Sequence, residues 1–236
     1  MKIPVHQIMT RTVFILLTLG LTLPASAQRE IDPTRFEQSI VSFESQDKVS
    51  PPPQGAIVLT GSSSIARWNN KAAQALAPLT VIARGFGGSV MEDVLYYLDR
   101  VAINYKPRAI LIYEGDNDTG LYSVPEDKIL SQFEEIVARV HSELPDTRIY
   151  VMSVKPSVAR QAVWSAAQRV SASFKAVADR DSQVYYIDAA SPFLQSDGTV
   201  MTDIFVEDGL HLNDKGNQIW GQLIKAALMP VEASFE

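Results

Sequence analysis

Cysteine is absent from the 236-residue chain, so the protein has no disulfide framework, no thiolate nucleophile and no cysteine-ligated metal. An apolar run from about Val13 to Leu23 is well short of the roughly 20 residues that a transmembrane helix needs. Basic residues are also in deficit, with 21 against 27 acidic ones, giving a formal net charge of −6. This acidic balance argues against nucleic acid and anionic membranes as partners.

The N-terminus has the parts of a secretory signal peptide. Lys2 and Arg11 supply positive charge, the apolar run follows, and Ala25-Ser26-Ala27 forms an A-x-A cleavage site. We therefore expect residues 1–27 to be removed and the mature, exported protein to begin at Gln28, in the periplasm or outside the cell. No cysteine follows the cut, which excludes a lipoprotein anchor. The removed segment carries two basic residues and no acid, so the formal charge changes from −6 to −8.

Histidine is scarce, and this limits the chemistry further. Of three histidines, His6 leaves with the signal peptide, which leaves His141 and His211. His141 lies near the C-terminal end of an amphipathic segment, where a histidine usually does no more than interact with the helix dipole. His211 follows Asp208 by three residues in "EDGLHLND", a spacing that lets a carboxylate fix the tautomer of the imidazole and leave Nε2 free as a base.

Short apolar segments alternate with amphipathic ones along the rest of the chain. The apolar segments, typical of strands buried on both faces of a parallel sheet, are Ala56–Thr60, Leu79–Ala83, Ala109–Tyr113, Ile149–Val154 and Val184–Asp188. The predicted helices are Pro33–Asp47, Val90–Asn104, Pro125–Glu143, Ala162–Asp181 and Asp214–Met229. Residues 28–55 thus hold an N-terminal helix and a proline-rich lead-in. The alternation predicts a single domain over 28–236, a three-layer α/β/α sandwich with a parallel sheet of about five strands.

In such a sheet, ligands bind where the strands end, so the residues after each strand are the candidate site. "GSSS" at 61–64 follows the first strand and supplies a serine as nucleophile, although alone it is more typical of a turn or helix cap. "RGFGGS" at 84–89 brings backbone N–H groups close to a ligand, and it lacks the last glycine of a dinucleotide-binding motif. "EGDND" at 114–118 offers the amide of Asn117 for an oxyanion, whereas a calcium loop would need ligands that are missing.

Together these four blocks resemble the SGNH or GDSL hydrolases, a family named after its Ser, Gly, Asn and His blocks. The resemblance runs from about Ile57 to Trp220 and implies a flavodoxin-like fold. Gly61-Ser62-Ser63 aligns with the usual Gly-Asp-Ser, which makes Ser63 the implied nucleophile and places Ser62 where relatives carry aspartate. Ser64 then helps to start the following helical turn.

The resemblance implies an esterase mechanism without a metal or organic cofactor. Ser63 attacks an ester carbonyl, His211 moves its proton and Asp208 orients the ring, while the N–H groups of Ser63, Gly88 and Asn117 hold the oxyanion. Water then hydrolyses the acyl-enzyme. The same residues serve an O-acyltransferase, and a third reading is an inactive protein that binds a glycan or partner.

The substrate is less well defined by the sequence. The loops Lys155–Arg160 and Ser191–Phe205 have no readable signature, and no long hydrophobic lid is visible. We therefore expect a short-chain acyl ester or an acetylated carbohydrate rather than a triglyceride. The aromatic residues near the strand ends, Phe86, Tyr113, Tyr122 and Trp164, are more typical of a core than of a binding site.

Overall fold

The computed structural model describes residues 30–236, and the predicted signal peptide and its cleavage site lie outside them. One parallel sheet has the strand order β2-β1-β3-β4-β5. Its strands are β1 (Ile57–Gly61), β2 (Val81–Gly85), β3 (Ala109–Tyr113), β4 (Arg148–Met152) and β5 (Val184–Ile187). The predicted sheet of about five parallel strands is therefore confirmed.

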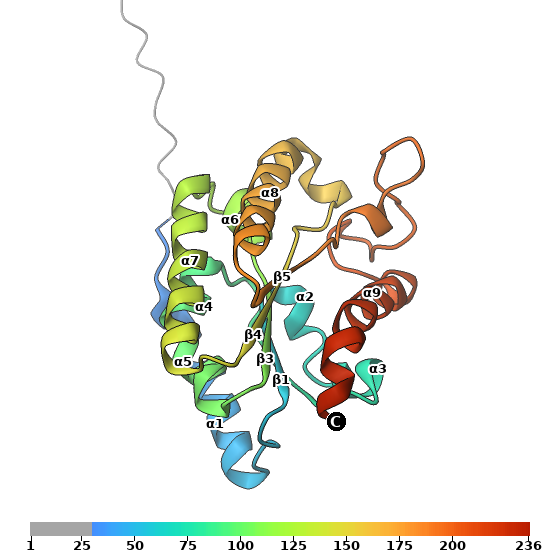
Figure 1. Ribbon diagram of the computed structural model, residues 1–236. Coiled ribbons are helices and arrows are strands. Elements are labelled where there is room, and N and C mark those ends of the chain that lie inside the picture. The colour runs from blue at the N-terminus through green and yellow to red at the C-terminus, as the bar shows by residue number, and fades with distance from the viewer. Residues whose placement is uncertain (1–29) are drawn as a thin grey trace, which may run out of the picture.

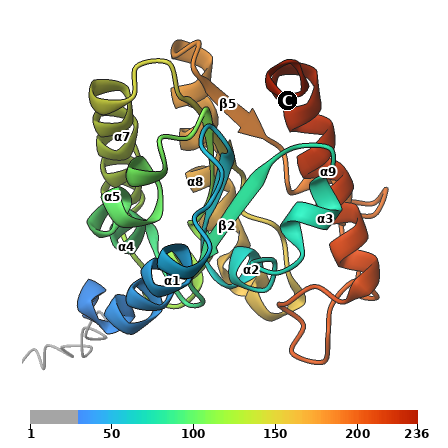
Figure 2. The same cartoon turned by 90° about the horizontal axis from the view of Figure 1, so that it is seen from below.

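Helices cover both faces of the sheet (Figures 1 and 2). One face is covered by α1 (Glu37–Val49), α4 (Met91–Tyr96), α5 (Leu98–Val101), α7 (Glu126–Glu143) and α8 (Trp164–Arg180). The other is covered by α3 (Ala72–Leu76) and α9 (Asp214–Glu232). Two one-turn helices, α2 (Ser63–Ala66) and α6 (Asp116–Gly120), directly follow β1 and β3. Short 3-10 turns occupy Pro33–Phe36, Ile103–Tyr105, Val158–Val163, Ser191–Phe193 and Ala233–Phe235.

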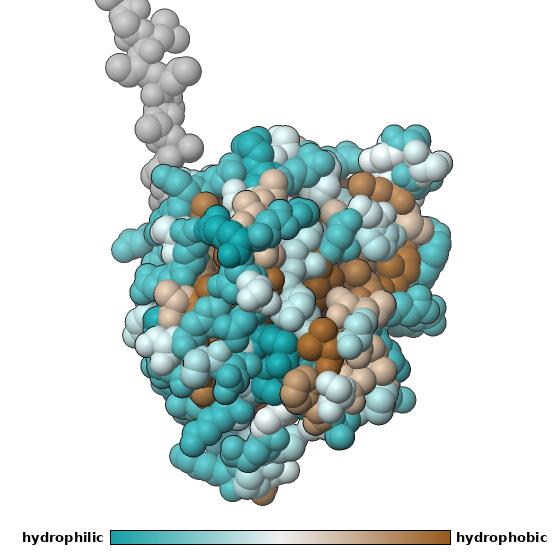
Figure 3. All heavy atoms as spheres, viewed as in Figure 1, coloured by the Kyte–Doolittle hydropathy of each residue, from teal (hydrophilic) through white to brown (hydrophobic). Residues whose placement is uncertain are grey.

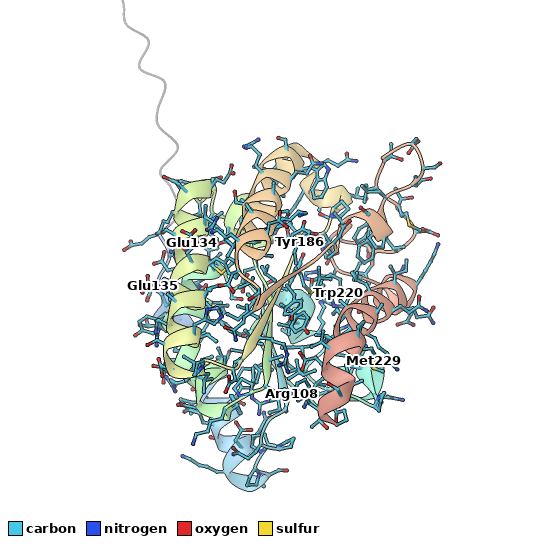
Figure 4. The ribbon with its side chains drawn as sticks, in the orientation of Figure 1. Arg108, Glu134, Glu135, Tyr186, Trp220 and Met229 are labelled. Carbon is cyan, nitrogen blue, oxygen red and sulfur yellow. The ribbon has the colours of Figure 1, made fainter. Side chains whose placement is uncertain are left out.

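The strands are apolar because both of their faces are buried. Every residue of β1 and β3 is inaccessible to solvent, so alternate side chains fill two separate hydrophobic cores. On the α9 side, the ring of Trp220 packs edge-on against Tyr113, with 4.9 Å between the ring centroids. In Figure 4, Trp220 lies between α9 and the sheet, whereas Glu134 and Glu135 lie on the outer side of α7.

The segment predicted as one helix over Val90–Asn104 is instead broken into α4, α5 and a 3-10 turn. Tyr97 departs from helical geometry between α4 and α5, with φ −97° and ψ 11°. Its ring is buried and packs edge-on against Tyr96 and Phe86, at centroid distances of 4.8 and 6.3 Å. Aromatic packing thus overrides a continuous helix here.

The last helix runs three residues further than predicted, through Pro230 to Glu232. Glu232 is fully buried and its carboxylate binds the guanidinium groups of Arg148 and Arg108, at 2.6 and 3.2 Å, and the Tyr150 hydroxyl at 2.8 Å. These contacts hold the final turn, although the proline cannot donate a backbone hydrogen bond there.

The face drawn in Figure 3 is mostly hydrophilic, and its apolar residues gather near α9 and the segment between β5 and α9. That segment carries Asp208 and His211. Along residues 30–236, none of the helices is both long and apolar enough to cross a membrane.

Candidate active site

The strand order reverses between β1 and β3, because β1 pairs with β2 on one side and with β3 on the other. The loops that leave these two strands therefore diverge at the C-terminal edge of the sheet, which is the usual place for a ligand site in open α/β sheets. Ser63 is the first residue of α2, after β1, and Asn117 lies in α6, after β3. The fold thus brings two of the predicted site residues to its topological switch point.

The turn into α2 is held by backbone contacts. Gly61 has φ +132°, and a Cβ there would lie 2.2 Å from the carbonyl oxygen of Tyr113, so only glycine fits. The Ser62 N–H donates to that same carbonyl, and the Ser62 carbonyl accepts the N–H of Ala66 at 2.9 Å. Ser62 is therefore the N-cap of α2 and acts through its backbone, while Ser64 is the second residue of this helix.

Ser63, His211 and Asp208 form a continuous hydrogen-bonded chain. Ser63 Oγ lies 2.9 Å from His211 Nε2, and His211 Nδ1 lies 2.6 Å from Asp208 Oδ2. The other carboxylate oxygen, Oδ1, accepts the backbone N–H groups of Leu210 and His211, each at 2.9 Å. All three predicted residues are brought together, with Nε2 of the histidine facing the serine.

The environment of Asp208 favours its charged form. Partial desolvation opposes ionisation, but the hydrogen bonds from the His211 ring and from two backbone N–H groups outweigh it and hold the pKa of Asp208 well below its ordinary value. A persistent carboxylate beside Nδ1 keeps that nitrogen protonated and leaves Nε2 as a proton acceptor.

Three N–H groups are free to contact a ligand beside Ser63. Within the part of the chain that the structure describes, the backbone N–H groups of Ser63 and Gly88 donate to no protein acceptor. Gly88 adopts φ +92°, and a Cβ on its neighbour Gly87 would lie 3.8 Å from the Cβ of Ser63, so this glycine loop borders the nucleophile. The Asn117 amide donates one N–H to the carbonyl of Ser89 at 2.9 Å, which leaves its second N–H for a ligand.

The loop after β4, which has no readable signature in the sequence, supports this site. Lys155 is 2 % exposed; its ammonium group donates to the carbonyl of Leu210 at 2.9 Å and lies 3.5 Å from the Asp116 carboxylate. The Ala159 N–H donates to the carbonyl of Gly209 at 3.1 Å. This loop therefore joins the segment that carries Asp208 and His211 to the one that carries Asn117.

Glu114 is a second buried group that the sequence did not single out. It is fully buried, its Oε1 accepts the Ser89 hydroxyl, and its Oε2 has no hydrogen-bond partner within residues 30–236. Burial, together with the nearby Asp118 carboxylate, raises the pKa of Glu114 well above its ordinary value and so favours the neutral carboxyl. The only sequence signal was an acidic residue directly after an apolar strand.

His141 and three of the candidate aromatic residues have structural roles. His141 lies in the last turn of α7, and its Nδ1 is 3.6 Å from an oxygen of Asp181, as expected for a structural histidine. The rings of Phe86, Tyr113 and Tyr122 are buried in or beside the two cores, which agrees with the core reading.

Known proteins share this sequence pattern and this fold. Platelet-activating factor acetylhydrolase IB subunit alpha1 from Pongo abelii is 25 % identical over 143 residues, which cover 59 % of this chain and 60 % of that protein. The chain thus spans about 60 % of the length of the curated relatives it matches.

Solved structures resemble the fold over most of the chain. A GDSL-like lipase from Bacteroides thetaiotaomicron has a TM-score of 0.68 and 18 % identity, covering 81 % of this chain and 97 % of that one. A catalytic mutant of an acetylxylan esterase from Geobacillus stearothermophilus has a TM-score of 0.62 and 14 % identity, covering 75 % and 95 %. The model of the GDSL-like Lipase/Acylhydrolase family matches residues 50–219, well over half of the chain. This protein therefore belongs to the GDSL-like lipase/acylhydrolase family.

Proposed function

We propose that the protein is a serine esterase that hydrolyses carboxylic esters through an acyl-enzyme. The observation that carries the proposal is the chain Ser63 Oγ–His211 Nε2–His211 Nδ1–Asp208 Oδ2, with distances of 2.9 and 2.6 Å, at the switch point of the sheet. An unperturbed serine hydroxyl is a weak nucleophile, and an adjacent base oriented by a carboxylate is what activates it.

The chemistry follows from these positions. Nε2 of His211 takes the proton of Ser63 as Oγ attacks the ester carbonyl, and the carbonyl oxygen becomes an oxyanion. The free N–H groups of Ser63, Gly88 and Asn117 stabilise that charge. The imidazolium then protonates the leaving alcohol, and a water molecule, deprotonated by the same nitrogen, releases the acid and restores Ser63.

We further propose a substrate with a short acyl group on a polar alcohol, such as an acetylated carbohydrate. Three exposed aliphatic side chains lie on the loops of the site, namely Leu121, Val158 and Val206, and together they offer a small apolar contact for a short acyl group. A groove of about 410 Å³ begins at the glycine loop, and its polar lining includes Gln38, Ser39 and Ser42. Uncharged amides and hydroxyls of this kind suit sugar hydroxyl groups.

The names of two similar proteins agree with an acetyl ester as the substrate. One is an acetylhydrolase and the other an acetylxylan esterase. An O-acyltransferase would use the same residues and differ in the acceptor. Export by the predicted signal peptide would place the enzyme where extracellular polymers are found.

Purified protein should release nitrophenol from 4-nitrophenyl acetate, and a serine-directed phosphonate should label Ser63. Ser63→Ala should abolish both signals, whereas the matched variants Ser62→Ala and Ser64→Ala should keep them. If wild-type protein is inert in both assays, the esterase proposal is wrong and an inactive binding protein is the better reading.

Esters with acyl chains from acetate to palmitate, measured beside acetylated sugars, test the proposed substrate preference. We expect the highest kcat/KM at acetate or a similarly short chain, and a maximum at long chains would contradict the proposed substrate. Product analysis with added sugar separates the two reactions, because a transferase forms a new sugar ester whereas a hydrolase releases free acid.

A further inference from the structure

Arg160 contacts the proposed oxyanion donor from behind. Its guanidinium donates from Nη2 to Asn117 Oδ1 at 2.7 Å, and from Nη1 to the side chain of Asp116 at 2.8 Å and also to the backbone carbonyl of Asp116. The Arg160 side chain is 15 % exposed, so little water competes for these contacts. The arginine comes from the loop after β4, about forty residues further along the chain than its partners.

This contact determines which end of the amide faces the site. A guanidinium can only donate, so the atom of Asn117 that faces Arg160 must be the oxygen. The amide nitrogen then faces the carbonyl of Ser89 and the ligand side, as a donor to an oxyanion must. A cation on the amide oxygen also draws electron density from the N–H bonds, which makes them stronger donors.

Gly120 provides an independent observation, because it leaves the space that the arginine fills. A Cβ at Gly120 would lie 2.5 Å from Arg160 Cδ and 2.7 Å from Arg160 Nη1. These distances are too short for non-bonded atoms, so any larger residue there must displace the arginine side chain. Gly120 lies in α6, three residues after Asn117, so one short helix holds both the oxyanion donor and the space for its support.

We propose that Arg160 is a positioning residue for the oxyanion hole, acting through the Asn117 amide. It touches neither Ser63 nor His211, and its effect is to orient and polarise a donor whose hydrogen bond is made mainly in the transition state. This inference rests on the proposed esterase activity. Interactions of that kind raise kcat and change KM little.

A double-mutant cycle on kcat tests the proposal. With a short-chain nitrophenyl ester, Asn117→Ala should lower kcat about 10²–10³-fold, as expected for one oxyanion donor. Arg160→Ala should lower kcat about 10–100-fold, with KM within about threefold of wild type. In the double variant the arginine effect should vanish, because its route through Asn117 has been removed. Arg160→Lys should not restore kcat, since an ammonium lacks the planar fork that reaches both partners.

Gly120→Ala and Arg169→Ala complete the design. Gly120→Ala keeps the guanidinium but displaces it, so it should lower kcat as Arg160→Ala does. Combined with Asn117→Ala, it should cause no further loss of kcat. Arg169→Ala removes an exposed arginine of α8, whose ion pair with Glu126 spans 3.1 Å, and should leave kcat unchanged. Thermal melting of each variant shows whether the fold is intact.

Two results would overturn the inference. One is a double variant whose loss of kcat equals the product of the losses in Arg160→Ala and Asn117→Ala. The other is an Arg160→Ala variant with a raised KM and an unchanged kcat. Inactive wild-type protein would instead refute the esterase proposal itself, so the two failures are distinguishable.

Discussion

Replacing Asp208 with asparagine tests how the structure fixes the proton on His211. Asp208 Oδ1 accepts two backbone N–H groups at 2.9 Å, and Oδ2 lies 2.6 Å from His211 Nδ1. In the variant, the amide oxygen must stay with the backbone donors, because an NH₂ group cannot accept from them. The NH₂ group then faces Nδ1 and forces the proton onto Nε2. In that tautomer, His211 cannot take a proton from Ser63.

The size of the loss follows from what it costs to turn the amide over. The reversed amide restores the reactive tautomer but leaves two backbone N–H donors unpaired, at about 1–3 kcal/mol each. The reactive arrangement is thus disfavoured by about 2–6 kcal/mol, or a factor of about 30 to 10⁴ in rate. Because the Asp208 side chain is 43 % exposed, water partly solvates those donors. We therefore expect kcat to fall about 30- to 1000-fold, less than the roughly 10⁴ typical of a buried triad aspartate.

The assay is the kcat for 4-nitrophenyl acetate, measured beside the melting temperature. Asp214→Asn is the matched control, because it makes the same chemical change at an exposed position in the first turn of α9. The reasoning is refuted if Asp208→Asn keeps more than a third of the wild-type kcat while its melting temperature matches that of the control. It is refuted equally if the control loses as much activity as the test variant.

Three further predictions concern the residues that hold the site and the sheet. Gly61→Ala should abolish folding or activity because its Cβ meets a carbonyl oxygen at 2.2 Å, whereas Gly55→Ala, with open space around it at φ +67°, should cost only about 1–2 kcal/mol in denaturant unfolding. Glu232→Ala leaves the partly buried guanidinium of Arg148 without its carboxylate and removes one of the two carboxylates beside Arg108, which keeps Glu236, so it should lower the free energy of unfolding by about 3 kcal/mol, with kcat unchanged. Glu114 binds its proton more tightly in the folded protein. The stability that this proton contributes is therefore fully present below the unfolded pKa near 4.5, and it is lost as the pH rises toward the pKa of Glu114 in the folded protein. Glu114→Gln copies the protonated form, so the melting temperature of the variant should rise relative to wild type between pH 4 and 8, and a constant difference would contradict this.

The strands were predictable because burial on both faces leaves a continuous apolar run. β3 was predicted residue for residue, and the others within two residues at each end. The predicted bounds of β2 were two residues too early at both ends. Leu79 is buried in the turn after α3 rather than in the sheet, while Arg84 is a strand residue whose guanidinium pairs with Asp47 of α1. Apolarity therefore indicates burial, and only the tertiary partner decides which buried residues belong to the ladder.

The Asp208–His211 pair was predictable because its geometry is local, with the histidine three positions after the aspartate. Lys155 and Arg160 were not predictable, since their partners lie about forty to fifty-five residues away. An isolated lysine or arginine in a polar loop reads as a solvated cation. The feature that could have drawn attention to them is their place after β4, at the same edge of the sheet as the other site loops.

Ser62 shows why the first block was the least clear in the sequence. The family pattern has an aspartate there, yet Ser62 is 2 % exposed and contributes through its backbone, whose N–H binds the Tyr113 carbonyl and whose carbonyl caps α2. Within the described chain, no hydrogen bond to its hydroxyl is formed. The turn that presents Ser63 therefore depends on Gly61 and on main-chain contacts, which any small residue at position 62 can make. A motif residue that acts through its backbone can be substituted without disturbing the neighbouring catalytic residue, whereas Gly61 cannot be substituted.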